Sequence, residues 1–176
     1  MAKTSASFTL MDYTDGISLI TGIDSNLPLT SLYDTSNQTL NPSWAGDTSL
    51  QLTPVVRKAG GTDVVSTMTA KAWKRRIAGS ATWTTVTSGS NGETINATSG
   101  VLTVSEDKLT TDVWQIDYQF SGTYTDPVLN LAFPVTIVIT LSRVANGTSF
   151  VVARAYATGG SQFKNHSPSS LSVKAE

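Results

Sequence analysis

Hydrophobic and polar residues alternate along several short stretches of the chain, most clearly from Trp114 to Phe120. Every second residue there is aromatic or aliphatic, and the residues between are Gln, Asp and Gln. Because successive side chains of a β-strand point to opposite faces, the pattern predicts a strand with one buried face. Val135–Leu141 is more continuously apolar and β-branched, which predicts a strand covered on both faces.

Shorter stretches of the same kind, separated by turn residues rich in Gly, Asn, Pro and Ser, predict further strands. They are Ser49–Val56, Val65–Ile77, Trp83–Val86, Val101–Val104 and Phe150–Tyr156. No stretch has the apolar spacing and end signals of a helix, apart from one expected turn near Ser105–Leu109. The chain is therefore predicted to be all-β, as a sandwich or barrel.

Two features favour an immunoglobulin-like (Ig-like) antiparallel β-sandwich. Trp73 lies where such sandwiches place a core tryptophan on the third strand, and the strand that begins at Trp114 resembles their penultimate core strand. The chain contains 0 cysteines, so the usual disulfide between the sheets cannot form.

Composition narrows the choice of partners. Hydrophobic residues make up 39% and charged residues 14% of the 176 residues, and the formal net charge is −1, so no positive field attracts nucleic acid or an anionic membrane. The start, MAKTSASFTL, lacks the apolar core of a signal peptide, and Leu129–Leu141 is too short for a spanning helix. These features predict a soluble protein made inside a cell, with no nucleic-acid or membrane partner.

The side chains that could carry catalysis are few and scattered. His166 is the single histidine of the sequence. It lies in a polar loop, and no acidic residue or second histidine stands near it at the spacing of metal ligands or of a catalytic triad. The basic cluster from Lys71 to Arg76 is expected to be a solvated face around an inward Trp73. We expect no catalytic, cofactor-binding or metal-binding residues, no cofactor and no enzymatic activity.

Tryptophan offers an alternative function. Flat aromatic rings stack on sugars, and Trp44 and Trp83 follow turns and are the candidates for a glycan platform. Trp73 and Trp114 alternate with polar neighbours and are expected to be core residues.

The ends of the chain differ from its middle. Residues 1–25 are predicted to form an attachment or oligomerisation arm that adds a strand to a partner's sheet edge. The apolar residues expected to make this contact are Phe8, Leu10, Tyr13, Ile17 and Leu19. Residues 26–145 form the predicted sandwich, and 146–176 a linker with the first strands of a possible second module.

The second module is inferred from a repeat. Ser49–Val55 and Ser170–Glu176 share an alternating pattern at a spacing of about 120 residues, and each follows an aromatic residue and an Asn/Pro/Ser turn. The other interpretation is that the last segment completes the first sandwich as an edge strand.

Residues from about 26 to 145 resemble the Ig-like modules of bacteriophage tail, baseplate and fibre proteins. The segments that carry the resemblance are Asn26–Asp34, Gln38–Trp44, Ser49–Val55, Ala72–Arg75, Gly100–Val104 and Tyr118–Asp126. The resemblance implies a structural role in a virion, assembly as an oligomer, and no catalytic residues. We expect the protein to be made in the host cytoplasm and to contact other virion proteins.

The first hypothesis is therefore the particle-proximal part of a fibre or tail-associated protein, held by its N-terminal arm. By analogy with fibres we expect a homo-oligomer, with a trimer as the guess. The second is a carbohydrate-binding module for the host cell surface. The third is a glycan hydrolase, for which the sequence shows no acid pair.

Overall fold

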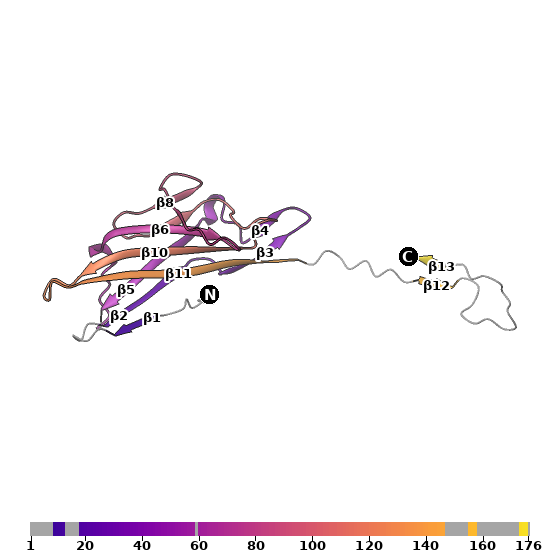
Figure 1. Cartoon of the computed structure of the whole chain (residues 1–176). Coiled ribbons are helices and arrows are strands. Elements are labelled where there is room, and N and C mark those ends of the chain that lie inside the picture. The colour runs from indigo at the N-terminus through magenta and orange to yellow at the C-terminus, as the bar shows by residue number, and fades with distance from the viewer. Residues whose placement is uncertain (1–8, 13–17, 59, 147–154, 158–172, 176) are drawn as a thin grey trace. The chain divides into compact units, whose positions relative to one another are not determined.

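The structure is a computed structural model that describes residues 9–12, 18–58, 60–146, 155–157 and 173–175. The chain divides into two compact units, residues 1–146 and residues 147–176. The first unit is a sandwich of two sheets (Figure 1).

The first sheet has five strands in the order β1-β2-β5-β9-β8, and all neighbours are antiparallel. Its strands are β1 (Thr9–Asp12), β2 (Ser18–Ser25), β5 (Leu50–Lys58), β8 (Glu93–Ile95) and β9 (Leu102–Val104).

The second sheet has six strands in the order β4-β3-β11-β10-β6-β7, antiparallel except for the parallel pair of β3 and β11. Its strands are β3 (Thr30–Asp34), β4 (Thr39–Asn41), β6 (Thr69–Ile77), β7 (Thr84–Thr85), β10 (Gln115–Thr125) and β11 (Ala132–Ala145). Two 3-10 turns, η1 (Gly46–Thr48) and η2 (Val65–Thr67), lie in connections.

This topology confirms the predicted fold class. The neighbours β2-β5-β9-β8 correspond to strands A, B, E and D of an immunoglobulin sandwich, and β11-β10-β6 correspond to G, F and C. The first strand is divided between the sheets, because β2 joins one sheet and β3 joins the other.

The core forms where the inward faces of the long strands meet. Trp73 on β6 is buried against Phe120 on β10, with ring centroids 5.3 Å apart. Its indole Nε1–H donates to the Gly100 carbonyl oxygen at 2.7 Å, so the one polar atom of this ring is satisfied inside the sandwich. Burial alternates along β10 and β11, as the period of a strand requires.

Three sequence predictions are wrong in detail. Trp114 is 55% exposed, because β10 begins one residue later and Trp114 lies beyond the covered part of the sheet. The outward residues of β11 are exposed, including Val138, because none of the described residues of this unit covers that face of the strand. The expected helical turn at Ser105–Leu109 is an irregular connection.

The predicted boundary at residue 25 is also corrected. β2 pairs with β5 from Leu19 to Ser25, and β1 pairs with β2 as the edge strand of the same sheet. The sandwich therefore includes Thr9–Asp12 and the residues from Ser18 onward. In the second unit, β12 (Ala155–Ala157) pairs with β13 (Val173–Ala175). The predicted second module otherwise lies outside the described residues.

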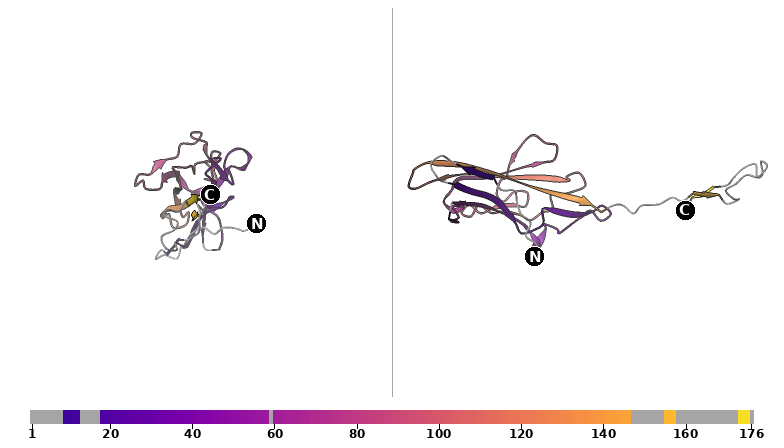
Figure 2. Two further views of the ribbon diagram at one scale, coloured as in Figure 1. Left: turned by 90° about the vertical axis from the view of Figure 1, so that its right-hand side faces the viewer. Right: turned by 90° about the horizontal axis from the view of Figure 1, so that it is seen from below.

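The sandwich has two ends, which we call the loop end and the exit end. The loop end contains the first residue of β2, the last residue of β5 and the connection from β10 to β11. The exit end is where β11 finishes beside Tyr33 of β3. The 14 residues of β11 run between them, a span of about 46 Å at roughly 3.3 Å per residue (Figures 1 and 2).

Candidate interaction site

The connection between β10 and β11, residues 126–131, is a tight loop held by its first residue. One carboxylate oxygen of Asp126 accepts hydrogen bonds from the backbone N–H groups of Val128 (2.9 Å) and Leu129 (3.0 Å). The Asp126 N–H donates to the Leu131 carbonyl, and the Asn130 N–H donates to the Asp126 carbonyl, each at 2.9 Å. Turns are commonly closed by an Asp whose carboxylate accepts hydrogen bonds from the backbone N–H groups two and three residues later.

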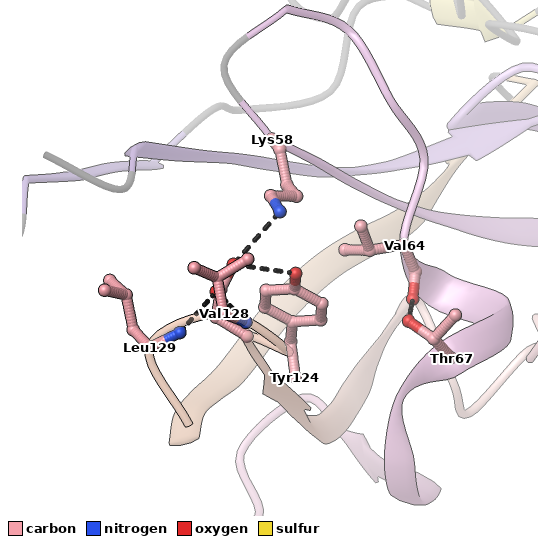
Figure 3. A network of polar contacts seen from close by, with 7 residues as sticks. Lys58, Val64, Thr67, Tyr124, Val128 and Leu129 are labelled. Atoms are coloured by element: carbon pink, nitrogen blue, oxygen red, sulfur yellow. Dashed lines mark hydrogen bonds and ion pairs between the residues drawn. The ribbon is translucent and has the colours of Figure 1, made fainter. Parts of the chain in front are cut away.

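The other carboxylate oxygen of Asp126 ties the loop to the sandwich. It accepts from Lys58 Nζ on β5 at 3.0 Å and from the Tyr124 hydroxyl on β10 at 3.2 Å (Figure 3). The Asp126 side chain is only 4% exposed. The backbone N–H of Leu129, then Lys58 and the N–H of Val128, hold the pKa of Asp126 well below its usual range. The hydroxyl of Tyr124 and the Asp126 carboxylate raise the pKa of Lys58.

This anchoring presents three aliphatic side chains to solvent. Val128 is 86% exposed, Leu129 44% and Leu131 42%. We call these three residues the apolar tip. Exposed aliphatic groups close together usually mark a contact surface, and a loop already fixed in one conformation loses little entropy when it binds. The geometry therefore fits a docking loop.

We expect Asp126→Asn to loosen the loop and to flatten the acid dependence of stability. The folded-state pKa is depressed, so the stabilisation is present above the unfolded pKa of about 3.9 and is lost as pH falls through the folded value. Thermal unfolding should show a melting temperature several degrees lower for the variant at pH 6, and a shrinking difference from pH 4 to pH 2. Asp112→Asn, at an exposed position, is the control. A constant difference across this range would contradict the role of the carboxylate.

The residues predicted for the attachment arm do not form one site. Leu19 is buried in the core on β2, so its assignment to the arm is wrong: its side chain fills the sandwich and cannot reach a partner. Leu10 lies in β1, paired with β2 of the same sandwich. Phe8, Tyr13 and Ile17 lie outside the described residues.

The two predicted glycan-platform tryptophans are in different environments. Trp44 is fully buried, so its ring offers no face to a sugar and that prediction is wrong. Its backbone N–H donates to Asp107, which also accepts from the Ser43 hydroxyl. Trp83 is partly buried, and the Arg76 guanidinium lies 4.6 Å from its ring centroid.

Two arginines of the basic cluster around Trp73 form ion pairs. Arg75 Nη1 lies 2.7 Å from Glu93 on β8, and Arg76 Nε donates to Asp117 on β10 at 2.8 Å. Burial alone would raise the pKa of Asp117, but the hydrogen bonds from Thr140, Arg76 and Gln115 outweigh it, and the net shift is downward. These cations hold strands together, which the sequence pattern did not reveal.

Several other acids close turns. The Asp34 carboxylate accepts from the side chain of Asn37 and the N–H of Ser36, and these bonds lower its pKa. Within the described ranges, no three His, Cys, Asp or Glu side chains gather as a metal site. In the same ranges, no helix is long and apolar enough to cross a bilayer. His166 lies outside them.

The sequence analysis did not predict the apolar tip. Asp126 was noted only as the end of a segment that carries the resemblance, and Leu129 only as the start of a stretch too short for a spanning helix. The available signal was the order of the residues: an Asp-Pro turn is followed by Val128, Leu129 and Leu131, where a turn between strands usually carries polar residues.

No family model matches this chain, and a search of curated proteins finds no significant match. What the chain does is therefore inferred from its fold and its surface.

Proposed function

We propose that this chain is a non-enzymatic structural protein of a bacteriophage virion, the particle-proximal part of a fibre or tail-associated protein. The observation that carries the proposal is the apolar tip, held rigidly at the end of an Ig-like sandwich opposite the exit of β11. A module with a contact loop at one end and the chain leaving at the other is suited to joining components in line.

The attachment region of this proposal differs from the arm of residues 1–25 that the sequence predicted. β1 (Thr9–Asp12) and the residues from Ser18 onward belong to the sandwich, so the arm of this proposal comprises residues 1–8, ahead of β1. The loop end, with the apolar tip and the start of β2, is the particle-proximal end in this proposal. Other virion proteins are its partners, and virions are its location.

The test is to find the protein in particles. An antibody against the sandwich should detect the chain in purified virions and should label one position, at the tail or a fibre base, in electron micrographs. Detection only in the soluble fraction of infected cells, with none in purified particles, would reject the virion role.

The oligomeric state is a separate expectation. We propose a homo-oligomer, with a trimer suggested only by analogy with fibres. The mass of the full chain in solution, measured by light scattering, decides between a closed trimer and other assemblies.

A second candidate function is binding of glycans on the host cell surface. One observation favours it: Trp83 lies partly exposed beside the Arg76 guanidinium, and an aromatic ring next to a polar side chain is suited to a sugar. Under the structural proposal, we expect cell-wall glycans to cause no saturable change in tryptophan fluorescence. A saturable change abolished by Trp83→Ala, but retained in Trp114→Ala, would favour glycan binding instead.

A further inference from the structure

Two segments of the sandwich run in the same direction and meet side by side. β2 begins at the loop end, and β3 continues the chain toward the exit end. β11 also runs from the loop end to the exit end, and it pairs with β3 in parallel. The last strand of the sandwich therefore lies against β3 at the end where the chain leaves (Figure 1).

Backbone hydrogen bonds fasten this parallel pair at both of its ends. The Ser142 N–H donates to the Leu29 carbonyl oxygen at 2.9 Å. At the other end, the Asn146 N–H donates to the Tyr33 carbonyl oxygen, also at 2.9 Å. The side-chain Oδ1 of Asn146 accepts from the Thr35 N–H at 3.0 Å, so Asn146 is bonded twice to the segment that contains β3.

Side chains join the same pair to a third segment. The Arg143 guanidinium of β11 lies 4.4 Å from the ring centroid of Tyr33 on β3. Arg143 Nη2 also donates to the Thr111 carbonyl oxygen at 2.7 Å, and the hydroxyls of Tyr33 and Thr111 are hydrogen-bonded at 2.9 Å. Since Thr111 belongs to the connection from β9 to β10, these contacts hold β3, β11 and that connection together.

Hydrogen bonds between parallel strands resist tension to a degree that depends on its direction. Pulling the start of β2 away from the end of β11 draws β3 and β11 past one another, so that their bonds carry the load together. Pulling the neighbouring C-terminal ends of β3 and β11 apart breaks the bonds one after another. Each bond is individually weak, so strong resistance requires that several break in one step. The parallel pair is therefore suited to tension along the sandwich.

We propose that the β3–β11 pair, residues 29–35 and 142–146, is a load-bearing clamp that keeps the sandwich folded under tension along its length. The inference rests on the proposed structural function, in which the arm ahead of β1 holds the chain to the particle. The outer part of the chain then pulls on the end of β11, and the most direct path for the load runs from β2 through β3 to β11.

β1 does not carry this load. It is an edge strand, and its pairs with β2 run from Thr9–Thr21 to Asp12–Ser18, at the loop end. Tension on the residues ahead of Thr9, directed toward the loop end, opens these pairs one after another. The load then acts on Ser18, the first residue of β2.

The first experiment is single-molecule force spectroscopy of the full chain. The sequence contains 0 cysteines, so introduced cysteines define where the force acts. Ser18→Cys with Gly147→Cys loads the clamp lengthwise. Ser36→Cys with Gly147→Cys is the matched control, because Ser36 follows β3 and the force then opens the same clamp from the exit end. We expect lengthwise unfolding to require several times the force of the control.

The second experiment removes a backbone donor from the clamp. Among the described residues, Val144 pairs only with Leu32 of β3, because the register of β11 with β10 ends at Ser142. Val144 is 54% exposed, so a proline ring has room there. Since proline lacks the N–H, Val144→Pro should raise the rate of lengthwise unfolding at a fixed force about tenfold.

Thr85→Pro is the control for this variant. Thr85 lies in β7, an exposed edge strand of the same sheet that pairs with β6 and is outside the path of the load. Interactions that are still intact in the transition state leave the unfolding rate unchanged, so Thr85→Pro should alter that rate by no more than about twofold. Asn146→Ala keeps the backbone and removes the Oδ1 acceptor, so it should raise the rate by a smaller factor than Val144→Pro.

Equal forces in the two pulling geometries overturn the inference. So do lengthwise unfolding rates that Val144→Pro and Asn146→Ala leave unchanged, and Asn146→Ala alone decides this point if Val144→Pro does not fold. None of these measurements depends on detection in virions. A chain that is found in particles but unfolds at low force in both geometries rejects the clamp and leaves the virion role standing. A strong clamp in a chain absent from particles does the reverse.

Discussion

Glu93→Ala should destabilise the sandwich by about 3–5 kcal/mol, the cost of leaving a buried ionic partner uncompensated. The Glu93 side chain is 1% exposed on β8. It pairs with Arg75 of β6 at 2.7 Å and accepts from the Tyr118 hydroxyl of β10 at 3.0 Å. The three residues link the two sheets at a place where no disulfide does. Burial, and then the neighbouring Glu93 charge, raise the pKa of Tyr118, so its hydroxyl remains protonated and donates.

Urea unfolding followed by tryptophan fluorescence measures this effect. The free energy of unfolding of a typical domain is about 5–15 kcal/mol, so a decrease of the expected size should bring the Glu93→Ala variant close to unfolding at room temperature. Glu106→Ala is the matched control: Glu106 is exposed, its pair with Lys108 is at the surface, and we expect a change within about 1 kcal/mol.

A double variant separates the loss of the ionic interaction of Glu93 from the loss of its packing volume. Removing both charges with Arg75→Met and Glu93→Leu should retain more stability than Glu93→Ala alone, because apolar groups of similar size often replace a buried pair at little cost. If Glu93→Ala and Glu106→Ala were equally stable, the buried network would contribute nothing measurable.

Trp44→Ala should destabilise the protein by about 3–5 kcal/mol, as expected for truncating a fully buried large aromatic side chain. Trp44 lies in the connection from β4 to β5, and its indole ring packs in the core. The Trp44 Nε1 atom has no hydrogen-bond partner among the described residues, so Trp44→Phe should lose much less than Trp44→Ala.

This prediction also separates two functional interpretations. Trp83→Ala should change stability by no more than about 1 kcal/mol, since a partly exposed ring beside one arginine is removed. Circular dichroism melting of the three variants measures the difference. A Trp44→Ala variant as stable as the unchanged protein would show that the ring is not a core element, and the glycan-platform hypothesis for Trp44 would return.

Much of the fold could be predicted because strand alternation is local. The apolar periodicity in β10, the position of Trp73 and the turn residues between strands led directly to an Ig-like sandwich. Strand ends were less accessible. Trp114 continues the alternation of β10 in sequence but lies beyond the covered part of the sheet, and local pattern carries no information about what covers a residue.

Little of the candidate site could be predicted, since its residues meet only through the topology. Lys58 and Asp126 are 68 positions apart in the chain, and the arrangement of the two sheets brings them together. Trp44 shows the opposite error: its position after a turn in the sequence suggested a free ring, whereas the ring is fully buried in the core.

The sequence by itself determined that this is an all-β chain whose alternating residues build a sandwich without disulfides, because side-chain period and turn chemistry act between near neighbours. Only the tertiary structure decided which side chains are free to make contacts. It buried Trp44 and Leu19, and it paired Arg75 and Arg76 with acids. It also left Val128, Leu129 and Leu131 exposed on a fixed loop. Exposure and long-range charge pairing depend on which strands lie side by side, and that is a property of the whole fold.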